Sequence, residues 1–185
     1  MKKFIIIAAA FLGFTTAANA QSNASSAASQ TVQLSLANAL EITFTGNSSA
    51  TGATVTLPFS TVNDYADGVE SAAQEIKVRS NKNFTVTVKT SSANFSVTNN
   101  GSTTTSSMPA SVLGVVVSAN NTGGTIGTGF SASAYNALSA TAANLITNAN
   151  NGGNQTFSVK YKATPGFAYP AGTYATDVVY TATQQ

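Results

Sequence analysis

Apolar side chains at every second position constrain this chain more than any other feature of its sequence. Between positions 32 and 44 the large apolar residues are even-numbered, and only Asn38 interrupts the set. An extended strand directs alternate side chains to opposite faces, so this segment is predicted to be a strand with one buried and one solvent-facing side. The same spacing recurs at positions 55–59, 76–78, 84–88, 95–97, 115–117, 157–161 and 174–180.

Turn residues separate these segments. "SNKN" at 80–83 and "TNNG" at 98–101 contain Asn and Gly, which tolerate positive φ and therefore suit tight connections. Many short strands at this spacing predict an all-β fold, an immunoglobulin-like sandwich of two antiparallel sheets. The Ala-rich stretch 131–153 is compatible with a short helix or with strands. Its Thr and Asn content favours strands or an ordered loop, because both are poor helix formers.

The first twenty residues have the features of a bacterial secretory signal peptide. Lys2 and Lys3 precede an apolar run from Phe4 to Phe14, and Ala18 and Ala20 form an A-x-A cleavage site. The run is about half the ~20 residues that a membrane-spanning helix needs, which argues against a permanent anchor. We therefore predict a signal peptide at 1–20, a flexible leader at 21–30 without large apolar residues, and a single sandwich domain at 31–185.

The predicted mature chain carries almost no net charge. Cleavage removes Lys2 and Lys3 from eight basic residues, which leaves six basic against six acidic side chains. A nucleic-acid site needs a cationic stripe, so binding to nucleic acid is not expected. No later segment is apolar enough to predict a membrane span. We expect a secreted protein that is periplasmic in transit and extracellular or held at the cell surface.

The residue types that most enzymes use are missing. The chain has no His and no Cys, so Ser-His-Asp and Cys-His arrangements cannot form, and zinc or copper would lack their usual ligands. "NDYADGVE" gathers Asp64, Asp67 and Glu70, whose oxygens could bind Ca²⁺. Its fit to a calcium loop is poor, because Tyr65 stands where a ligand belongs. We interpret this stretch as a solvated loop, and predict no enzyme activity, metal or cofactor.

The C-terminal stretch "YPAGTYATDVVYTATQQ" places Pro170 and Gly172 in a predicted turn before an alternating strand that runs to about Thr183. Together with the general strand pattern, it resembles the last strand of bacterial secreted immunoglobulin-like surface proteins, namely fimbrial (pilin-type) subunits and WxL-type cell-wall proteins. Gly172 lies fourteenth from the end, as in pilins. Gln184 replaces the penultimate aromatic residue of pilins, and the chain lacks both a pilin disulfide and the Trp motif of WxL proteins. The resemblance implies a structural or adhesive surface protein whose export can involve a chaperone.

Two functions follow as hypotheses. In the first, the chain is a subunit of a fimbria-like polymer, and one subunit donates a strand to the sheet of the next. The donor face would be the even-numbered set: Val32, Leu34, Leu36, Leu40, Ile42 and Phe44. Alternatively, this segment is simply the domain's own first strand. The second hypothesis is a monomeric module that binds polysaccharide or the cell wall, with Tyr65, Tyr135 and Tyr169 as the aromatic candidates.

Overall fold

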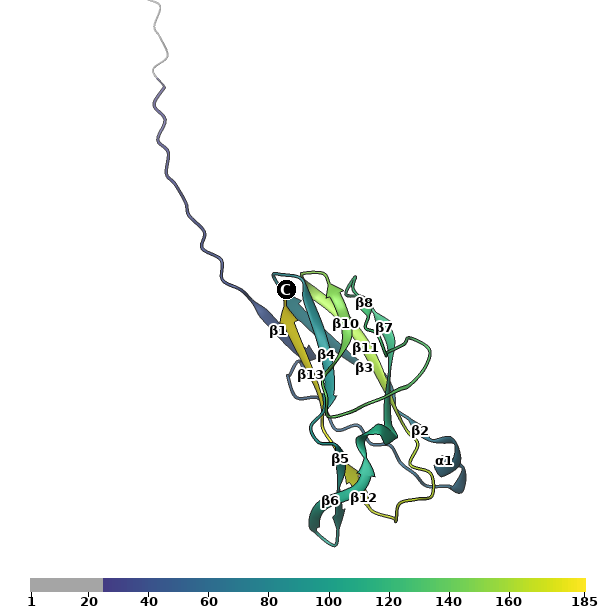
Figure 1. Cartoon of the computed structure of the whole chain (residues 1–185). Helices are drawn as coiled ribbons and strands as arrows, with labels where there is room; N and C mark the ends of the chain where they lie inside the picture. Colours follow the sequence, from purple (N-terminus) through teal and green to yellow (C-terminus); the bar gives the residue numbers. More distant parts are fainter. Residues whose placement is uncertain (1–24) are drawn as a thin grey trace, which may run out of the picture. The chain divides into compact units, whose positions relative to one another are not determined.

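The computed structural model describes residues 25–185, and the predicted signal peptide lies outside the described residues. Two antiparallel sheets pack against each other within residues 36–185, which confirms the predicted all-β sandwich (Figure 1). The larger sheet has the strand order β1-β3-β11-β7-β9, with β2 also beside β11. Its strands are β1 Leu40–Phe44, β2 Val69–Glu70, β3 Gln74–Ser80, β7 Leu113–Asn120, β9 Asn136–Ala137 and β11 Gly152–Ala163.

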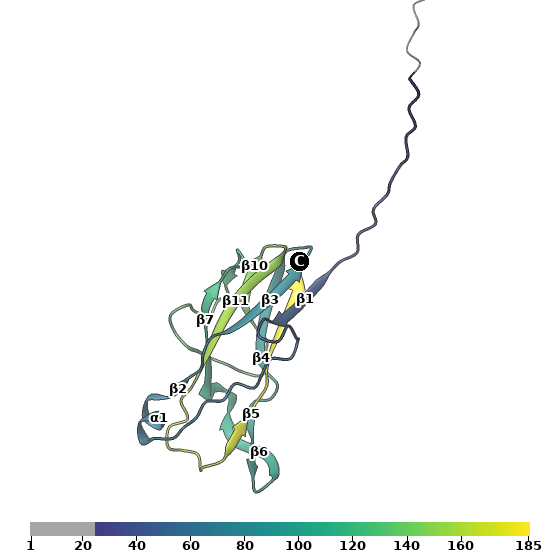
Figure 2. The same ribbon diagram turned by 180° about the vertical axis from the view of Figure 1, so that it is seen from behind.

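The second sheet has four strands in the order β13-β4-β10-β8. They are β4 Phe84–Thr90, β8 Thr125–Ile126, β10 Ala143–Ala149 and β13 Val178–Gln184. β1 therefore forms one edge of the larger sheet, and β13 forms one edge of the second. Figures 1 and 2 both show these two edge strands side by side, at the same side of the sandwich.

A smaller sheet extends the second one beyond a bend. It has the order β12-β5-β6, with β5 Asn94–Asn99, β6 Ser102–Pro109 and β12 Thr173–Ala175. β5 follows β4 along the chain and β12 precedes β13, so the β4–β13 pairing resumes as β5–β12. Between β5 and β6, Asn100 and Gly101 have φ of 48° and 81°, the two positive values of a type I′ hairpin turn. This bears out the turn predicted at "TNNG".

The core lies between the inward faces of the two main sheets. Alternate residues of β3, β4 and β11 are buried, as the period-two pattern predicted. Phe84 of β4 and Phe157 of β11 are the largest side chains that are fully shielded from water. The main buried apolar residues are Ile76, Val78, Phe84, Val86, Val88, Val115, Val117, Leu145, Ile146, Phe157 and Val159.

The stretch 131–153 contains β9, β10 and the start of β11 and no helix, as predicted. The last predicted strand is instead divided into β12 and β13, because the chain changes its register with β4–β5 at the bend. Residues 53–59 show alternating burial and place Val55, Leu57 and Phe59 against the core, yet they belong to no strand. No described strand pairs with them.

The prediction of a plain loop at "NDYADGVE" was wrong. Val62–Asp67 form the helix α1, and β2 follows it directly. Thr61 caps the helix through its hydroxyl, which accepts from the Asp64 N–H, and the Asp64 carboxylate accepts from the Thr61 N–H at 2.7 Å. This reciprocal capping box stabilises a helix that the hydrophobic pattern alone did not indicate.

Candidate functional site

The outer edge of β13 has backbone groups without a partner strand. Among the described residues, 25–185, β13 pairs only with β4. At its two ends the N–H of Gln185 donates to Asn83 O (2.9 Å), and the N–H of Ser91 donates to Asp177 O (2.9 Å). In an antiparallel ladder the bonded residues alternate, so the odd-numbered residues of β13 bond to β4. The even-numbered residues direct their N–H and C=O groups to the outer edge: Val178, Tyr180, Ala182 and Gln184.

The outer edge of β1 likewise has backbone groups without a partner strand. The only strand that pairs with β1 in the described part of the chain is β3. The N–H of Asn81 donates to Ala39 O (3.2 Å), and the N–H of Thr45 donates to Glu75 O (3.0 Å). The odd-numbered residues therefore bond to β3, and Leu40 and Ile42 direct their backbone groups outward. Four of these residues also pack their side chains against the core: Ile42, Val178, Tyr180 and Ala182.

We call the boundary between these two edges, Leu40–Phe44 and Val178–Gln184, the seam. Phe44 meets Tyr180 edge to face, with ring centroids 6.2 Å apart. At the other end the Gln184 side-chain amide donates to Ala39 O at 2.8 Å and lies 3.0 Å from both Ser80 Oγ and Asn81 Oδ1. No backbone hydrogen bond joins β1 to β13 within residues 25–185. The two strands contact each other across the seam through side chains.

Below the seam two tyrosine hydroxyls form a hydrogen bond in the core. Tyr161 of β11 and Tyr180 of β13 lie 2.8 Å apart between their Oη atoms, so this bond connects the two main sheets. Burial raises the pKa of Tyr161, and it raises that of Tyr180 well above its usual value. Both phenols are therefore neutral at physiological pH, as a hydroxyl–hydroxyl bond requires.

The predicted donor face divides into two parts. Val32, Leu34 and Leu36 lie in no strand, and their exposed fractions are 78%, 82% and 87%. The prediction that this part has a buried face is wrong for the chain by itself, because no neighbouring strand covers it. The other three donor candidates, Leu40, Ile42 and Phe44, lie in β1 of the domain's own sheet.

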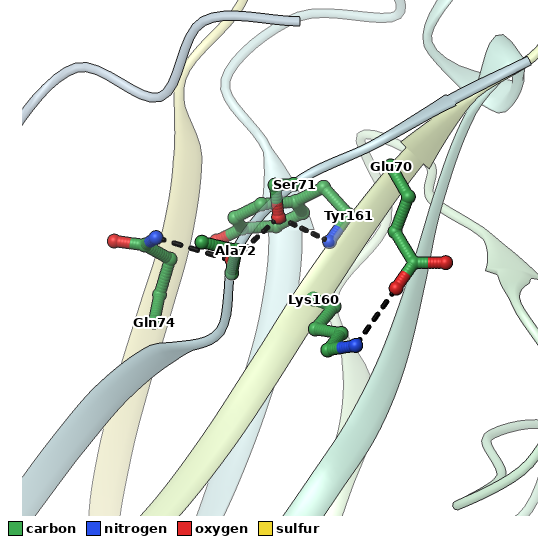
Figure 3. Close-up of polar contacts among 6 residues, drawn as sticks. All are labelled: Glu70, Ser71, Ala72, Gln74, Lys160 and Tyr161. Carbon is green, nitrogen blue, oxygen red and sulfur yellow. Dashed lines mark hydrogen bonds and ion pairs between the residues drawn. The ribbon is translucent and has the colours of Figure 1, made fainter.

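Figure 3 shows a group of polar contacts where β2 joins β11. The Lys160 ammonium donates to Glu70 at 2.8 Å. This bond is the main reason that the pKa of the Glu70 carboxyl is below its usual value. Burial, together with the neighbouring Glu70 carboxylate, raises the pKa of Tyr135. The cluster keeps an acid ionised and a phenol neutral, so neither group is prepared to exchange protons near neutral pH.

The remaining bonds in Figure 3 fasten the chain after β2 to β11. Ser71 donates its N–H to Tyr161 O (2.8 Å), and its hydroxyl accepts the N–H of Tyr161 (3.0 Å) and donates to Ala72 O (2.8 Å). Gln74 donates its amide to the same Ala72 carbonyl at 3.2 Å. The cluster is thus a local clamp that continues the pairing of β2 with β11.

The three candidate metal ligands diverge. Asp64 is used in the helix cap, where backbone N–H donors at Thr61 and Ser60 lower its pKa, and Glu70 binds Lys160. Asp67 ends α1. In the part of the chain that the structure describes, no group of three or more acidic residues is placed to hold a metal ion.

The three candidate tyrosines for sugar binding also lie apart. Tyr65 of α1 stacks on Phe167 with centroids 5.6 Å apart and touches Phe59 at 5.4 Å. Tyr135 lies beside Glu70, and Tyr169 packs against the core. The exposed member of the aromatic cluster, Phe167 at 68%, was missed by the sequence reasoning. Its only sequence signal is its position next to the turn "PG" at 165–166.

Within residues 25–185 no helix has the length and apolar character needed to cross a membrane. Neither a scan against protein-family models nor a search of curated proteins gave a match to this chain. Three features of the molecule bear on its function: the seam, the exposed residues Val32, Leu34 and Leu36, and the aromatic cluster of Phe59, Tyr65 and Phe167.

Proposed function

We propose that this chain is a structural subunit of a fimbria-like polymer on a bacterial surface, assembled when the N-terminal segment of one subunit pairs with a sheet of the next. This segment, residues 21–36, joins the predicted flexible stretch 21–30 to the alternating residues that follow it, and it is called the leader from here on. One observation carries the proposal: Val32, Leu34 and Leu36 alternate with polar residues as a half-buried strand would, but are 78–87% exposed. Burying such a side chain is worth about 1.5–3 kcal/mol each. A partner strand position would supply that burial.

The leader is suited to pairing in a second respect. Residues 25–40 contain no charged side chain, and Glu41 is the first charged residue after the predicted cleavage site. No like charges would oppose the approach of one subunit's leader to another. Exposed strands that avoid pairing usually carry Lys or Pro, and residues 31–36 have neither.

The test is sedimentation of the chain that begins at Gln21, followed by electron microscopy. We expect concentration-dependent oligomers or filaments from the wild type, and monomers from the triple variant Val32→Ser, Leu34→Ser, Leu36→Ser. The matched control changes the other face of the same segment: Thr31→Ala, Gln33→Ala and Ser35→Ala. It should assemble as the wild type does. A wild type that stays monomeric at high concentration, or equal effects of the two triple variants, would overturn the proposal.

The aromatic cluster supports a second candidate, a module that binds polysaccharide. Phe167 is 68% exposed and lies parallel to the Tyr65 ring, and a planar ring face can cover the apolar C–H face of a sugar. Binding of the wild type to a glycan array, lost in Phe167→Ala, would favour this candidate. An array without hits, together with oligomers in sedimentation, would favour the polymer.

A further inference from the structure

We propose that the free edge of β13 is the acceptor for the leader of a second copy of this chain, whose residues 31–36 add as a strand beyond β13. This inference rests on the proposed function and names the surface at which its pairing occurs. The surface consists of the outward backbone groups of Val178, Tyr180, Ala182 and Gln184. Adding a strand there would extend the second sheet to the order leader-β13-β4-β10-β8.

Among the long sheet edges in residues 25–185, β13 has the least protection against pairing. Its register with β4 is unbroken over all seven residues, and it contains no charged residue and no proline. Natural edges are usually guarded by charges, prolines or bulges. β6 has a register shift and ends at Pro109, and β1 carries Glu41 in an ion pair with Arg79 at 3.6 Å. β13 therefore has the fewest features that oppose backbone pairing with another strand, and the contacts that β1 makes with it across the seam are made through the side chains of Phe44, Tyr180 and Gln184.

The side chains of the leader match those of β13. Even-numbered residues of β13 face the core and odd-numbered residues face solvent, and Thr181 and Thr183 are exposed. The leader has the same order, with apolar residues at even and polar residues at odd positions. A strand paired with its apolar face inward would bring Val32, Leu34 and Leu36 toward the seam. There Leu40, 40% exposed, is the most exposed of the large apolar side chains of the seam.

The length of residues 31–36 also suits pairing with β13. Six residues at about 3.3 Å each extend about 20 Å, close to the span of the seven-residue β13. In antiparallel pairing, three leader residues would each exchange two backbone hydrogen bonds with β13. Strand addition of this kind draws affinity from the main chain and selectivity from alternate side chains.

The residues directly after the leader, Ala37 and Ala39, are bound beside β3. The Asn81 side chain donates to Ala37 O at 2.8 Å and accepts the Ala39 N–H at 3.0 Å. These two bonds continue the β1–β3 pairing backward to Ala37. A turn of the chain at residues 37–39 that paired residues 31–36 with β13 of the same copy would break both bonds. A second copy needs no such turn.

The test uses the full chain from Gln21 and a proline that blocks only the outer edge. Ala182→Pro removes an N–H that points away from β4, so the β13–β4 ladder keeps all its bonds. This variant retains its leader but loses its acceptor edge. The triple serine variant at positions 32, 34 and 36 has the reverse defect. We expect each variant alone to be monomeric, and an equimolar mixture to form heterodimers that do not grow further.

The control places a proline on another edge. Asn99 and Ser102 flank a two-residue turn and exchange hydrogen bonds, so Thr103 of β6 directs its N–H outward. Thr103→Pro should assemble as the wild type does. If Ala182→Pro assembles normally while the triple serine variant does not, the proposed function stands and the assignment of β13 is wrong. If the wild type does not assemble at all, both fail.

A cross-link gives an answer even if Ala182→Pro does not fold. The chain has no cysteine, so Gln33→Cys and Thr181→Cys in one chain introduce the only two thiols, both on the predicted solvent-facing side. A short bis-maleimide bridges a register slip of two residues, about 7 Å. We expect a ladder of linked subunits in denaturing gels. The control pair Gln33→Cys with Thr103→Cys should give single chains, and the opposite pattern would overturn the assignment.

Discussion

The hydroxyl pair that connects the two sheets gives a quantitative test of the core. Tyr180→Phe removes one partner of the 2.8 Å Oη–Oη bond and leaves the Tyr161 hydroxyl buried without an acceptor or donor. Leaving a buried polar group unsatisfied costs about 1–3 kcal/mol. We expect each single Phe variant to lose about 1–2 kcal/mol, which lowers Tm by about 2–8 °C for a domain of this size.

The double variant should lose far less than the sum of the two. Replacing both hydroxyls by apolar groups leaves nothing unsatisfied and can be nearly neutral. A double-mutant cycle by chemical denaturation should therefore show a coupling about as large as the two single losses together, about 2–4 kcal/mol. Tyr174→Phe is the matched control, because its hydroxyl donates to Pro170 O, not to Tyr180, and its effect should add to that of Tyr180→Phe. Additive losses in Tyr161→Phe/Tyr180→Phe would refute the bond as a stabilising element.

Three further outcomes follow from the same contacts and from the sequence. The pKa values of Tyr161 and Tyr180 are raised in the folded state. Their contribution to the free energy of unfolding is therefore full below pH ~10, and it is lost as the pH rises through the pKa values of the folded state. In urea titrations, the stability of the double Phe variant should fall less steeply at alkaline pH. Added Ca²⁺ should leave the Tm of the wild type and of Asp64→Asn/Asp67→Asn unchanged, since a ligand of the folded state must raise Tm, and a calcium-dependent rise would contradict the divergence of the carboxylates. N-terminal sequencing of the exported protein should begin at Gln21, and an intact Met1 would refute the predicted cleavage.

The period-two pattern correctly predicted the strands that have one buried face. One face of each of β3, β4 and β11 packs into the core. The pattern could not say which strands pair. Residues 53–59 alternate as clearly as β4, yet they have no partner strand, because pairing depends on contacts far apart in the sequence. The same limit applies to residues 32–36, where an identical pattern leaves the side chains exposed.

The sequence predicted one part of the candidate site, the donor residues, but not the acceptor edge. Val32, Leu34 and Leu36 could be identified from their alternation alone. The edge position of β13 could not, since it depends on the order of strands in a sheet and on which residues bond to β4. Gln184 illustrates the difference: in the sequence it is a departure from the pilin pattern, whereas in the fold its amide closes one end of the seam. Helix α1 was missed because its capping box is a polar signal that hydrophobic spacing ignores.

Residue-resolved amide hydrogen exchange tests the central claim most directly. In the monomeric triple serine variant, the odd-numbered amides Thr181 and Thr183 should be protected by β4, and the even-numbered amides Ala182 and Gln184 should exchange freely. In the assembled wild type we expect Ala182 and Gln184 to become protected, together with the amides of residues 32, 34 and 36. Assembly that leaves the even-numbered β13 amides unprotected, or that protects β6 instead, would contradict pairing of the leader with β13.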